Sequence, residues 1–335
     1  MRVLITGGAG YIGSTIASAC LDAGHDVVIV DDLSEGRAEF VTGRTFYSGD
    51  IADGALMDRV FTEQAIDVVV HCAAAIVVPE SVSKPLYYYE NNVGKTLDLL
   101  ATMARHGVNR LVFSSSASLY SPPEGQLAAT EDSPVAPGSP YARTKLVMEM
   151  ALSDVAHGSD LRAVALRYFN PIGADPELRS GQQRQHPSHV LAKMLEAWSV
   201  GGTFTITGCD WDTPDGTGIR DYLHIWDLAK AHVAAIERFD TVTAEEPYRV
   251  INIGRGEGVS VRQLAAAFQT ATGEPLKIAE GPSRPGDVLG AYAVVDAAHR
   301  DLGWTAELTV ADGIRDAIAW LRVLALSAWP DVERL

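Results

Sequence analysis

A tyrosine and a lysine spaced four residues apart are the first side chains in this sequence that could do chemistry together. Tyr141 and Lys145 follow Ser139 and Pro140, which are typical of an N-cap and a first helical residue, so we predict a helix over 140–156. Residues at i and i+4 share one face of a helix. A neighbouring ammonium favours the phenolate and lowers the pKa of a tyrosine from its reference value of about 10. The pair therefore predicts a general base that works near neutral pH.

The beginning of the chain predicts a site for the pyrophosphate of a dinucleotide. Val3–Ile5 has the composition of a strand buried on both faces, and Gly7, Gly10 and Gly13 follow it just before a helical pattern begins. Glycines let backbone amides come close to phosphates, and a helix N-terminus attracts negative charge. Gly8, Gly10 and Gly13 also fit the commoner three-glycine fingerprint, so the letters leave the register open.

Acidic residues at the ends of the next two predicted strands are candidates for contacts with adenosine. Asp31 follows the strand predicted at 27–30. A carboxylate there accepts hydrogen bonds from ribose hydroxyls and would repel a 2′-phosphate, which favours NAD over NADP. Asp50 follows the strand predicted at 45–47 and could contact adenine, although a turn aspartate after Gly49 is an equally simple interpretation.

Strands alternate with helices through the first half of the chain, which predicts a Rossmann-type, doubly wound parallel sheet of the α/β class. The predicted strands are 3–5, 27–30, 45–47, 67–71, 110–113 and 162–168, and the predicted helices after the first are 55–61, 86–106 and 140–156. In the helix at 86–106 we expect Leu86, Val93, Leu97, Leu100 and Ala104 to share one side. Residues 121–140 carry five prolines and are predicted to be a loop.

The alternation breaks after residue 170. We expect 1–170 to be the dinucleotide-binding domain, with a helix and a strand in 221–253 rejoining its sheet. Residues 171–220 and 254–335 would form a smaller α/β lobe that binds the substrate, with helices at 190–200, 260–272 and 309–325 and a strand at 203–207. Ligands of open α/β sheets lie beyond the carboxyl ends of the strands, so we expect the cleft between the two lobes.

Composition narrows the partners and the compartment. The net charge of −16, without any basic run, argues against nucleic acid or an anionic membrane as a partner. Three scattered cysteines without a CxxC pair indicate a reduced chain, and His186 and His189 lack a third metal ligand. The first strand begins at residue 2 and the apolar stretch 68–78 is too short to span a bilayer. We therefore expect a soluble cytoplasmic protein without a metal site.

Taken in order, these motifs resemble the extended short-chain dehydrogenase/reductase family. The motifs that carry the resemblance are the glycine turn, Asp31, Ser114-Ser-Ser-Ala-Ser-x-Tyr120 and Tyr141-x-x-x-Lys145. Three later motifs narrow the resemblance to the UDP-glucose 4-epimerases, namely Arg167-Tyr-Phe-Asn-Pro171, Gly218-Ile-Arg-Asp-Tyr-Leu-His224 and Arg284-Pro-Gly-Asp287. The resemblance covers nearly the whole chain. It implies NAD as the cofactor, a UDP-sugar as the substrate, and a homodimer formed through the helices at 86–106 and 140–156.

The resemblance also implies roles for individual residues. Ser116 would hydrogen-bond the sugar 4-hydroxyl and help pass its proton to Tyr141, and Lys145 would hold the nicotinamide ribose and depress the pKa of Tyr141. The C4 hydride would pass to NAD and return to the other face of a 4-keto sugar. The implied cofactor contacts are Gly7, Gly10, Tyr11, Ile12, Gly13, Asp31, Asp50, Ile51, Asn92, Tyr141, Lys145 and Tyr168. The implied substrate contacts are Ser116, Tyr141, Asn170, His189, Arg220, Arg284, Asp287 and Ala291.

Two arginines and an aspartate would hold the uridine diphosphate. Arg220 and Arg284 would grip the diphosphate, for which a bidentate guanidinium is well suited, and Asp287 would bind the uridine ribose. The sequence departs from the family at Ile76, where some members carry lysine. It departs again at His189 and Thr207, where many carry asparagine and an aromatic residue around the uracil.

Alanine at position 291 bears on the choice of sugar. In the family, a tyrosine at this point narrows the sugar pocket and a small residue admits an N-acetyl group. Ala291 therefore predicts that UDP-N-acetylglucosamine is accepted besides UDP-glucose. The alternative is that Ala291 only packs and that neighbouring side chains close the pocket.

Two other functions use part of the same motif set. A nucleotide-sugar 4,6-dehydratase shares the fold, the cofactor and the tyrosine–lysine pair, but it needs acid groups after the serine of the fifth strand, where this chain has Ala117 and Ser118. A non-enzymatic NAD-sensing module would keep the glycine turn and Asp31 without needing Ser116, Tyr141 and Lys145 together.

Overall fold

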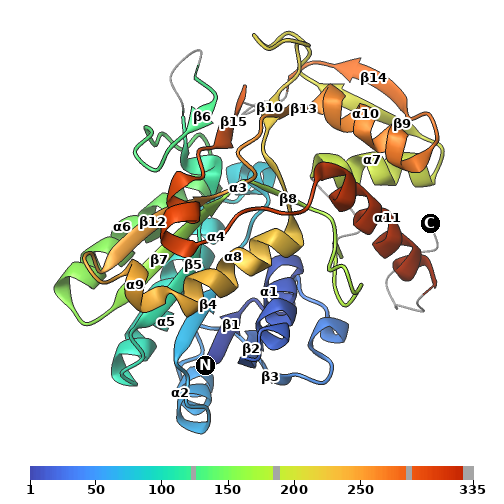
Figure 1. Cartoon of the computed structure of the whole chain (residues 1–335). Coiled ribbons are helices and arrows are strands. Elements are labelled where there is room, and N and C mark those ends of the chain that lie inside the picture. The colour runs from blue at the N-terminus through green and yellow to red at the C-terminus, as the bar shows by residue number, and fades with distance from the viewer. Residues whose placement is uncertain (122–125, 184–188, 284–288, 327–335) are drawn as a thin grey trace.

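The computed structural model of this chain describes residues 1–121, 126–183, 189–283 and 289–326. A seven-stranded parallel sheet forms its larger lobe, in the order β12-β7-β5-β4-β1-β2-β3 (Figure 1). The strands are β1 (Arg2–Thr6), β2 (Asp26–Asp31), β3 (Thr45–Ser48), β4 (Val68–His71), β5 (Arg110–Ser114), β7 (Arg162–Tyr168) and β12 (Tyr248–Ile253). Strand β1 pairs with β2 on one side and with β4 on the other, so the strand order reverses at this point of the sheet. Crevices for ligands form at such a reversal, beyond the carboxyl ends of the strands.

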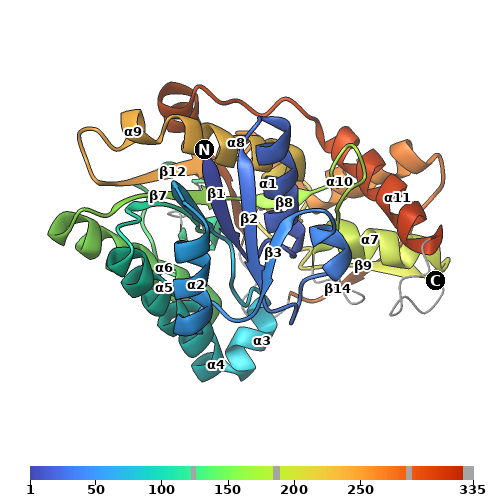
Figure 2. The same cartoon turned by 90° about the horizontal axis from the view of Figure 1, so that it is seen from below.

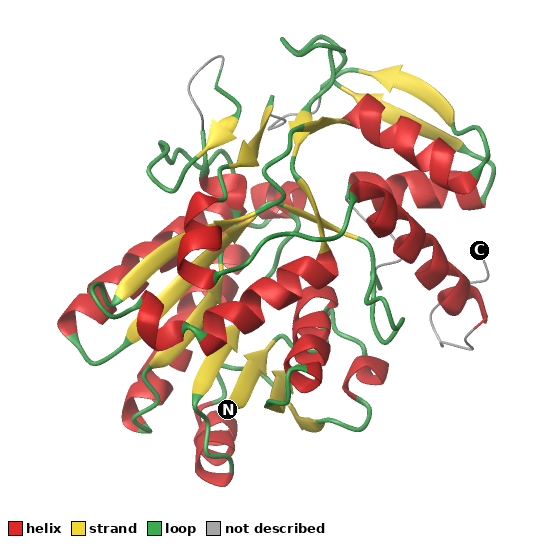
Figure 3. Cartoon of the chain, viewed as in Figure 1, coloured by secondary structure: helices red, strands yellow, loops and turns green. Residues whose placement is uncertain are grey.

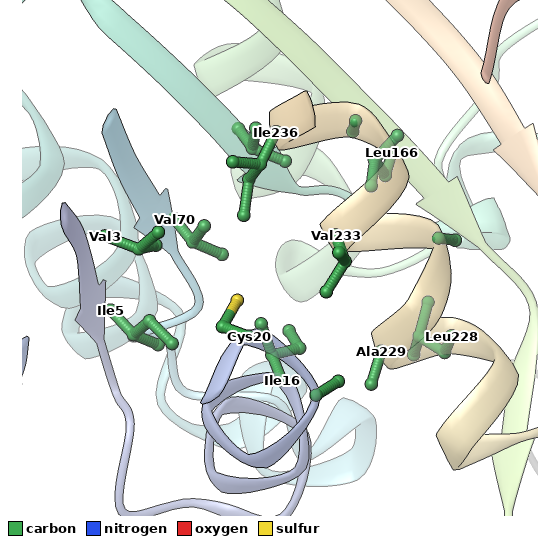
Figure 4. Packing of buried hydrophobic residues seen from close by; sticks show 14 of the residues in the cluster. Val3, Ile5, Ile16, Cys20, Val70, Leu166, Leu228, Ala229, Val233 and Ile236 are labelled. Atoms are coloured by element: carbon green, nitrogen blue, oxygen red, sulfur yellow. The ribbon is translucent and has the colours of Figure 1, made fainter. Parts of the chain in front are cut away.

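Helices cover both faces of this sheet (Figures 2 and 3). Helices α1 (Tyr11–Asp22) and α8 (Ile225–Glu237) lie on one face, and α2 (Gly54–Glu63), α5 (Lys95–Arg105) and α6 (Pro140–Gly158) lie on the other. Because side chains alternate along a strand, Val3 and Ile5 pack toward α1 and α8 (Figure 4). Leu4 packs on the opposite face, toward α2 and α5. This is the doubly wound α/β sheet that the sequence predicts.

A second lobe lies beyond the carboxyl edge of the sheet. It contains α7 (Val190–Ser199), β9 (Thr203–Thr207), α10 (Val261–Thr272), β14 (Lys277–Gly281) and α11 (Val310–Leu326), which surround their own apolar cluster. Short strands connect it to the larger lobe, namely β8 (Asn170–Ile172) paired with β11 (Tyr222–His224), and a sheet of β13 (Val259–Ser260), β10 (Ile219–Arg220), β15 (Gly290–Ala293) and β6 (Ala128–Ala129). In the described part of the chain, no helix is both long and apolar enough to cross a membrane.

Several elements differ from the sequence-based prediction. The helix expected from residue 221 begins at Ile225, because Tyr222–His224 pairs with β8 as a strand. Residues 126–140 are not entirely loop, since β6 pairs with β15 of the second lobe. The helix expected at 86–106 is divided into α4 (Pro85–Tyr89), a π-helical turn (Glu90–Gly94) and α5.

Five further short helices of the described residues are not predicted from the sequence. They are α3 (Val78–Ser83), α9 (Phe239–Val242), the 3-10 turns η1 (Ala38–Val41) and η3 (Ala117–Leu119), and the π-helical turn η4 (Ala298–Leu302). Strand β12 joins the first sheet beside β7, in register from Tyr248 opposite Ala163 to Ile253 opposite Tyr168. The segment 221–253 therefore belongs to the larger lobe, although the residues before it lie in the second lobe.

Candidate active site

A cavity of about 610 Å³ lies at the carboxyl edge of the large sheet. Its walls come from the residues that follow β1, β2, β3, β4, β5 and β7, with Gln182, Gln183 and His189 closing one side. We call it the central cavity. Its position matches the strand-order reversal described above, where backbone amides and polar side chains from several strands converge.

The glycine turn shapes one end of the central cavity. Gly7 has φ of +71°, and a side chain there would meet the backbone of Ala73. A Cβ on Gly13 would overlap the carbonyl oxygen of Gly7, so glycine lets α1 start directly against the turn. Gly10 is the N-cap of α1 and makes no side-chain cap, which leaves the amides of the helix end available to an anion. Gly7, Gly10 and Gly13 line the cavity, whereas Gly8 packs against Ile29.

Asp31 ends β2 at the rim of the central cavity. Its Oδ2 accepts a hydrogen bond from the amide of Ala9 at 2.9 Å, and its Oδ1 accepts one from the amide of Leu33 at 2.8 Å. Burial raises the pKa of Asp31, and the two amides act against that shift. The carboxylate is therefore held in a fixed orientation by the turn that binds it.

Asp50 and Lys95 form an ion pair on the next part of the wall. The Lys95 ammonium lies 2.6 Å from Asp50 Oδ2, and the amide of Ala52 donates to Asp50 Oδ1 at 2.9 Å. Burial disfavours the ionised carboxyl, but the amide and the ammonium outweigh it and the pKa of Asp50 is lowered. Ile51 lines the cavity beside them.

Asn92 supports the wall of the cavity from behind. It is buried, its Oδ1 accepts from the amide of Ala75 at 2.8 Å, and its Nδ2 donates to the Ala75 carbonyl and to Thr144. Its neighbour Asn91 lines the cavity. Asn92 therefore fixes the segment that follows β4, although the resemblance places it on the cofactor side.

Of the segment that follows β4, the sequence singles out only Ile76, as a departure from the family. Cys72 to Ile76 lines the central cavity along its length and approaches the glycine turn, where Ala73 lies against Gly7. The signal available was its place directly after a buried strand, because residues at the carboxyl ends of parallel strands face the ligand crevice. Small apolar residues carry no chemical signature of their own, so the motifs did not point to it.

Ser116, Tyr141 and Lys145 meet at the opposite end of the cavity. Ser116 follows β5, while Tyr141 and Lys145 lie in the first turns of α6, whose N-cap Ser139 accepts from the amide of Ala142. All three line the cavity and are nearly inaccessible to solvent. The Lys145 ammonium donates to the Ser114 carbonyl at 2.8 Å and lies 4.7 Å from the centre of the Phe113 ring.

Burial dominates the titration of this group. It raises the pKa of Tyr141, and a hydrogen bond with Ser116 partly opposes that rise. It lowers the pKa of Lys145 to about 8, which leaves the ammonium charged at neutral pH. The sequence-based expectation of a lowered Tyr141 pKa is therefore not met, since burial raises this pKa and Ser116, not Lys145, acts against the rise.

Buried polar side chains support the group from below. The Ser114 hydroxyl lies 3.1 Å from His232 Nε2 and 3.2 Å from the Cys72 thiol, and His232 Nδ1 lies 2.9 Å from the Leu228 carbonyl. Burial lowers the pKa of His232 to about 4, so this histidine is neutral in the folded protein at neutral pH. Ser114, whose carbonyl binds Lys145, is thereby fixed to α8.

The residues expected to bind substrate fall into three groups. Asn170 and His189 line the central cavity, as does Tyr168 from the cofactor set. Arg220 and Ala291 lie side by side on the paired strands β10 and β15, and neither lines the cavity among the residues that the structure describes. Arg284 and Asp287 lie outside the described residues.

Arg220 and Ala291 are nonetheless adjacent to the site. The Arg220 guanidinium donates to the carbonyls of Ile219 at 2.7 Å and Leu289 at 3.2 Å. Ala291 packs against the cluster that contains Tyr120 and Phe169, and Phe169 lines the cavity. Over the described ranges, no group of three or more histidine, cysteine, aspartate or glutamate side chains could hold a metal ion.

Known proteins resemble this chain along nearly its whole length. The model of the NAD dependent epimerase/dehydratase family matches residues 3–254. The chain belongs to this family. A UDP-glucose 4-epimerase of Azospirillum brasilense is 42% identical over 329 residues, which cover 97% of this chain and 93% of that protein.

Solved structures agree with the family. The UDP-glucose 4-epimerase of Bifidobacterium longum, in complex with NAD+ and UDP, is similar with a TM-score of 0.89 and 39% identity, covering 96% of this chain and 98% of that one. The UDP-Glc/GlcNAc 4-epimerase of Campylobacter jejuni is similar with a TM-score of 0.81 and 33% identity, covering 96% of this chain and 99% of that one. The resemblance drawn from the sequence motifs is confirmed.

The buried histidine beneath the site gives a prediction about acid stability. The pKa of His232 is about 4 when folded, against about 6.5 when unfolded, so the unfolded chain binds the extra proton between these pH values. The free energy of unfolding therefore falls as the pH drops from 6.5 toward 4. In His232→Gln we expect the slope of this fall to be smaller by about 1.4 kcal/mol per pH unit, measured by urea unfolding.

The matched control is His157→Gln, which changes an exposed histidine on α6 and should leave the slope unchanged. A His232→Gln protein with the wild-type slope would show that His232 takes up its proton without unfolding.

Proposed function

We propose that this protein is a UDP-glucose 4-epimerase, which interconverts UDP-glucose and UDP-galactose with NAD as its cofactor. The observation that carries the proposal is that Ser116, Tyr141 and Lys145 line the same cavity as the glycine turn and Asp31. A dinucleotide site alone serves many activities, so the site chemistry must decide between them. The hydroxyls of Ser116 and Tyr141, with the Lys145 ammonium, supply a base for a sugar hydroxyl. The relatives described above are named for this reaction.

The cavity residues fit NAD. The uncapped N-terminus of α1 at Gly10 suits a pyrophosphate, and the fixed carboxylate of Asp31 suits ribose hydroxyls while repelling a 2′-phosphate. When bound, NAD supplies the redox chemistry by accepting the C4 hydride and returning it to the other face of the 4-keto sugar. The chain then has to provide binding, orientation and proton transfer.

Ser116 and Tyr141 handle the proton of the 4-hydroxyl. The Ser116 hydroxyl is near enough to the Tyr141 hydroxyl to act on its pKa, and in the proposed mechanism the proton passes from the sugar oxygen through Ser116 to the phenolate of Tyr141 and returns by the same path. The raised pKa of Tyr141 means that this phenolate needs positive charge nearby. Lys145 supplies an ammonium one helical turn away, and its pKa of about 8 keeps it charged at neutral pH.

The residues that follow Ser116 argue against a 4,6-dehydratase. Eliminating water requires an acid group there, whereas Ala117 and Ser118 begin a 3-10 turn in which the Ser116 hydroxyl donates to Ser118 at 2.9 Å. A hydroxyl with a pKa far above neutrality is a poor proton donor to a leaving hydroxide.

The Tyr141 phenol gives the most direct test of this mechanism. Tyr141→Phe keeps the ring and removes the base, so we expect kcat for UDP-glucose to fall by at least about a hundredfold. Retention of NAD should be unchanged when bound nucleotide is released by acid and quantified. Tyr89→Phe removes a half-exposed hydroxyl group from α4 and is the control. Its kcat should stay within about twofold of the wild-type value. Substantial epimerase activity in Tyr141→Phe would overturn the proposal.

We further propose that the sugar pocket accepts N-acetylated UDP-sugars. Ala291 and Ala293 face the cluster of Tyr120 and Phe169, while the intervening Tyr292 packs on the other side of β15 against Gly258. The bulky neighbour is thus turned away, and the wall next to the site carries only methyl groups from β15. Space beside Phe169 is what an N-acetyl group would need.

Restoring bulk at this wall should separate the two substrates. In Ala291→Tyr we expect turnover of UDP-N-acetylglucosamine to fall by roughly 10- to 200-fold while turnover of UDP-glucose changes by only a few-fold. The two assays run in parallel on one enzyme preparation. Ala291→Ser, which adds little volume, is the control for both. Equal losses with the two sugars would argue that position 291 does not face the N-acetyl group.

We propose that two copies of the chain associate through helices α3 to α6. These helices lie together on one face of the large sheet and expose Val82, Leu86, Leu97 and Met150, whose exposed fractions are 65%, 69%, 45% and 59%. Exposure of Leu86 and Leu97 contrasts with a buried Leu100, so the apolar side chains of 86–106 do not all face the core. An apolar surface of this kind is typical of a protein interface, and a twofold axis brings the same helices together.

A charge on this surface should separate the copies. We expect the wild-type chain of 35.8 kDa to sediment as a dimer and Met150→Asp to sediment as a monomer in analytical ultracentrifugation. Val200→Asp, which places the same charge at a residue that is 61% exposed after α7, should remain dimeric. A monomeric wild type would refute the interface.

We also propose that the protein works in the cytoplasm on a small-molecule substrate. The three cysteines are free thiols, as is usual for proteins of a reducing compartment. The net charge of −16 would repel nucleic acid and anionic lipid.

A further inference from the structure

A segment of the chain between the two lobes ends at the rim of the central cavity. Residues 173–183, which we call the crossing segment, follow β8 and descend beside α1 (Figure 1). The last two of them, Gln182 and Gln183, line the cavity. None of the sequence motifs falls in this segment, and the proposed mechanism does not use it.

The crossing segment is bound along the side of α1. The Tyr11 hydroxyl donates to the Gly173 carbonyl at 2.7 Å, and the Thr15 and Ser180 hydroxyls lie 3.1 Å apart. Arg179 donates two hydrogen bonds to Asp22, at 2.7 and 2.9 Å. Each turn of α1 therefore holds one point of the segment, and Tyr11 itself lines the cavity.

Trp320 of the C-terminal helix α11 fixes the end of the segment. Its indole nitrogen donates to the Gln182 carbonyl at 2.9 Å, and its ring is 3% exposed. A Cβ on Gly181 would lie 2.5 Å from this ring, so the segment and the indole are in direct contact. The ring of Phe40, from the larger lobe, lies 5.8 Å from the Trp320 ring between centroids.

The end of the crossing segment contacts the part of the central cavity wall that contains Asp31. Gln183 Nε2 donates to the Glu35 carbonyl at 3.1 Å, and Glu35 and Gly36 both line the cavity. Gly36 is itself close to the carboxylate, because a Cβ there would lie 2.7 Å from Asp31 Oδ1. The contact between Gln183 and Glu35 thus bridges the second lobe to the ribose-binding carboxylate.

We propose that Trp320 is a positioning residue for the cofactor site, which holds Gly181 to Gln183 against the 35–40 segment and so slows the release of NAD. The inference rests on the proposed function only in taking NAD as the occupant of the central cavity. NAD leaves past this contact after the Gln183–Glu35 hydrogen bond breaks. Loss of the indole removes the hydrogen bond and the packing that keep the end of the crossing segment in place.

The rate of NAD dissociation measures this directly, independently of epimerase turnover. Enzyme loaded with radiolabelled NAD is mixed with excess unlabelled NAD, and the label retained on the protein is followed by rapid filtration. Loss of one hydrogen bond of about 1.4 kcal/mol corresponds to a tenfold change, so we expect Trp320→Ala to release NAD at least about tenfold faster than wild type. Trp320→Phe, which keeps a ring against Gly181, should fall between the two.

The matched control is Trp198→Ala in the same lobe. Like Trp320, Trp198 lies beside a phenyl ring, here edge-on against that of Phe268, and it donates its indole hydrogen to Glu274 at 2.8 Å. Neither of these two partners lies in the crossing segment or lines the central cavity, so the loss of Trp198 should leave NAD release at the wild-type rate. A Trp320→Ala protein that releases NAD no faster than Trp198→Ala would overturn the inference.

A second variant tests the contact itself and keeps the inference testable if Trp320→Ala does not fold. Gly181→Ala pushes a methyl group into the indole, so we expect this single variant to release NAD faster than wild type, and we expect no further increase when it is combined with Trp320→Ala. NAD release at the wild-type rate in Gly181→Ala, or additive effects of the two substitutions, would overturn the inference. A wild-type protein that binds no NAD would instead refute the proposed function.

Discussion

The contact between the Gly7 carbonyl and Gly13 determines where everything else in the site lies. A side chain at Gly13 would overlap that carbonyl, so only glycine lets α1 begin against the turn that ends β1. The open end of α1 then points into the crevice where the strand order reverses. The Ala9 amide in the same turn orients Asp31. One close backbone contact thus sets the position of both the helix end that we propose binds the pyrophosphate and the carboxylate that we propose binds the ribose.

The end of the site that contains Ser116 depends on buried polar side chains, and most of their hydrogen-bonding atoms are paired with one another. Arg167 and Glu149 form a buried ion pair with N–O distances down to 2.6 Å, and Glu149 also accepts a hydrogen bond from Ser115, the residue before Ser116. Arg167 extends to the Tyr120 hydroxyl at 3.0 Å, and Tyr120 donates to Asn252 on β12 at 2.6 Å. Such a network costs desolvation, but it fixes geometry when its members are paired. The network ties the loop that carries Ser116 to the large sheet, whose strand β5 also binds the Lys145 ammonium through the Ser114 carbonyl.

The sequence predicted features that depend on local spacing and missed features that depend on distant contacts. The glycine turn, Asp31 and the Tyr141–Lys145 pair are local patterns, and each lines the cavity as expected. The glutamines of the crossing segment and Trp320 have no such pattern, because their importance comes from elements more than a hundred residues apart. The raised pKa of Tyr141 could not be predicted either, since the sequence records a neighbouring lysine but not the burial that raises this pKa.

Sheet order and helix boundaries show the same division. Alternating strands and helices predicted a parallel sheet, and buried runs such as Val3–Ile5 did become central strands. The composition of Tyr222–His224 continues into α8 and predicts helix, and only its pairing with β8 makes it a strand. Leu86 and Leu97 fit a helical stripe, yet both are exposed, because periodicity cannot tell a core from an interface.

The most direct test follows the hydrogen on C4 of the sugar. Purified protein, without added nicotinamide cofactor, is incubated with UDP-glucose that carries deuterium at C4, and the UDP-galactose formed is analysed by NMR. A cofactor held within the central cavity should return the same hydrogen, so we expect UDP-galactose that retains deuterium at C4. Loss of the deuterium to solvent, or a reaction that proceeds only with a stoichiometric external oxidant, would contradict an epimerase that works with one tightly held NAD.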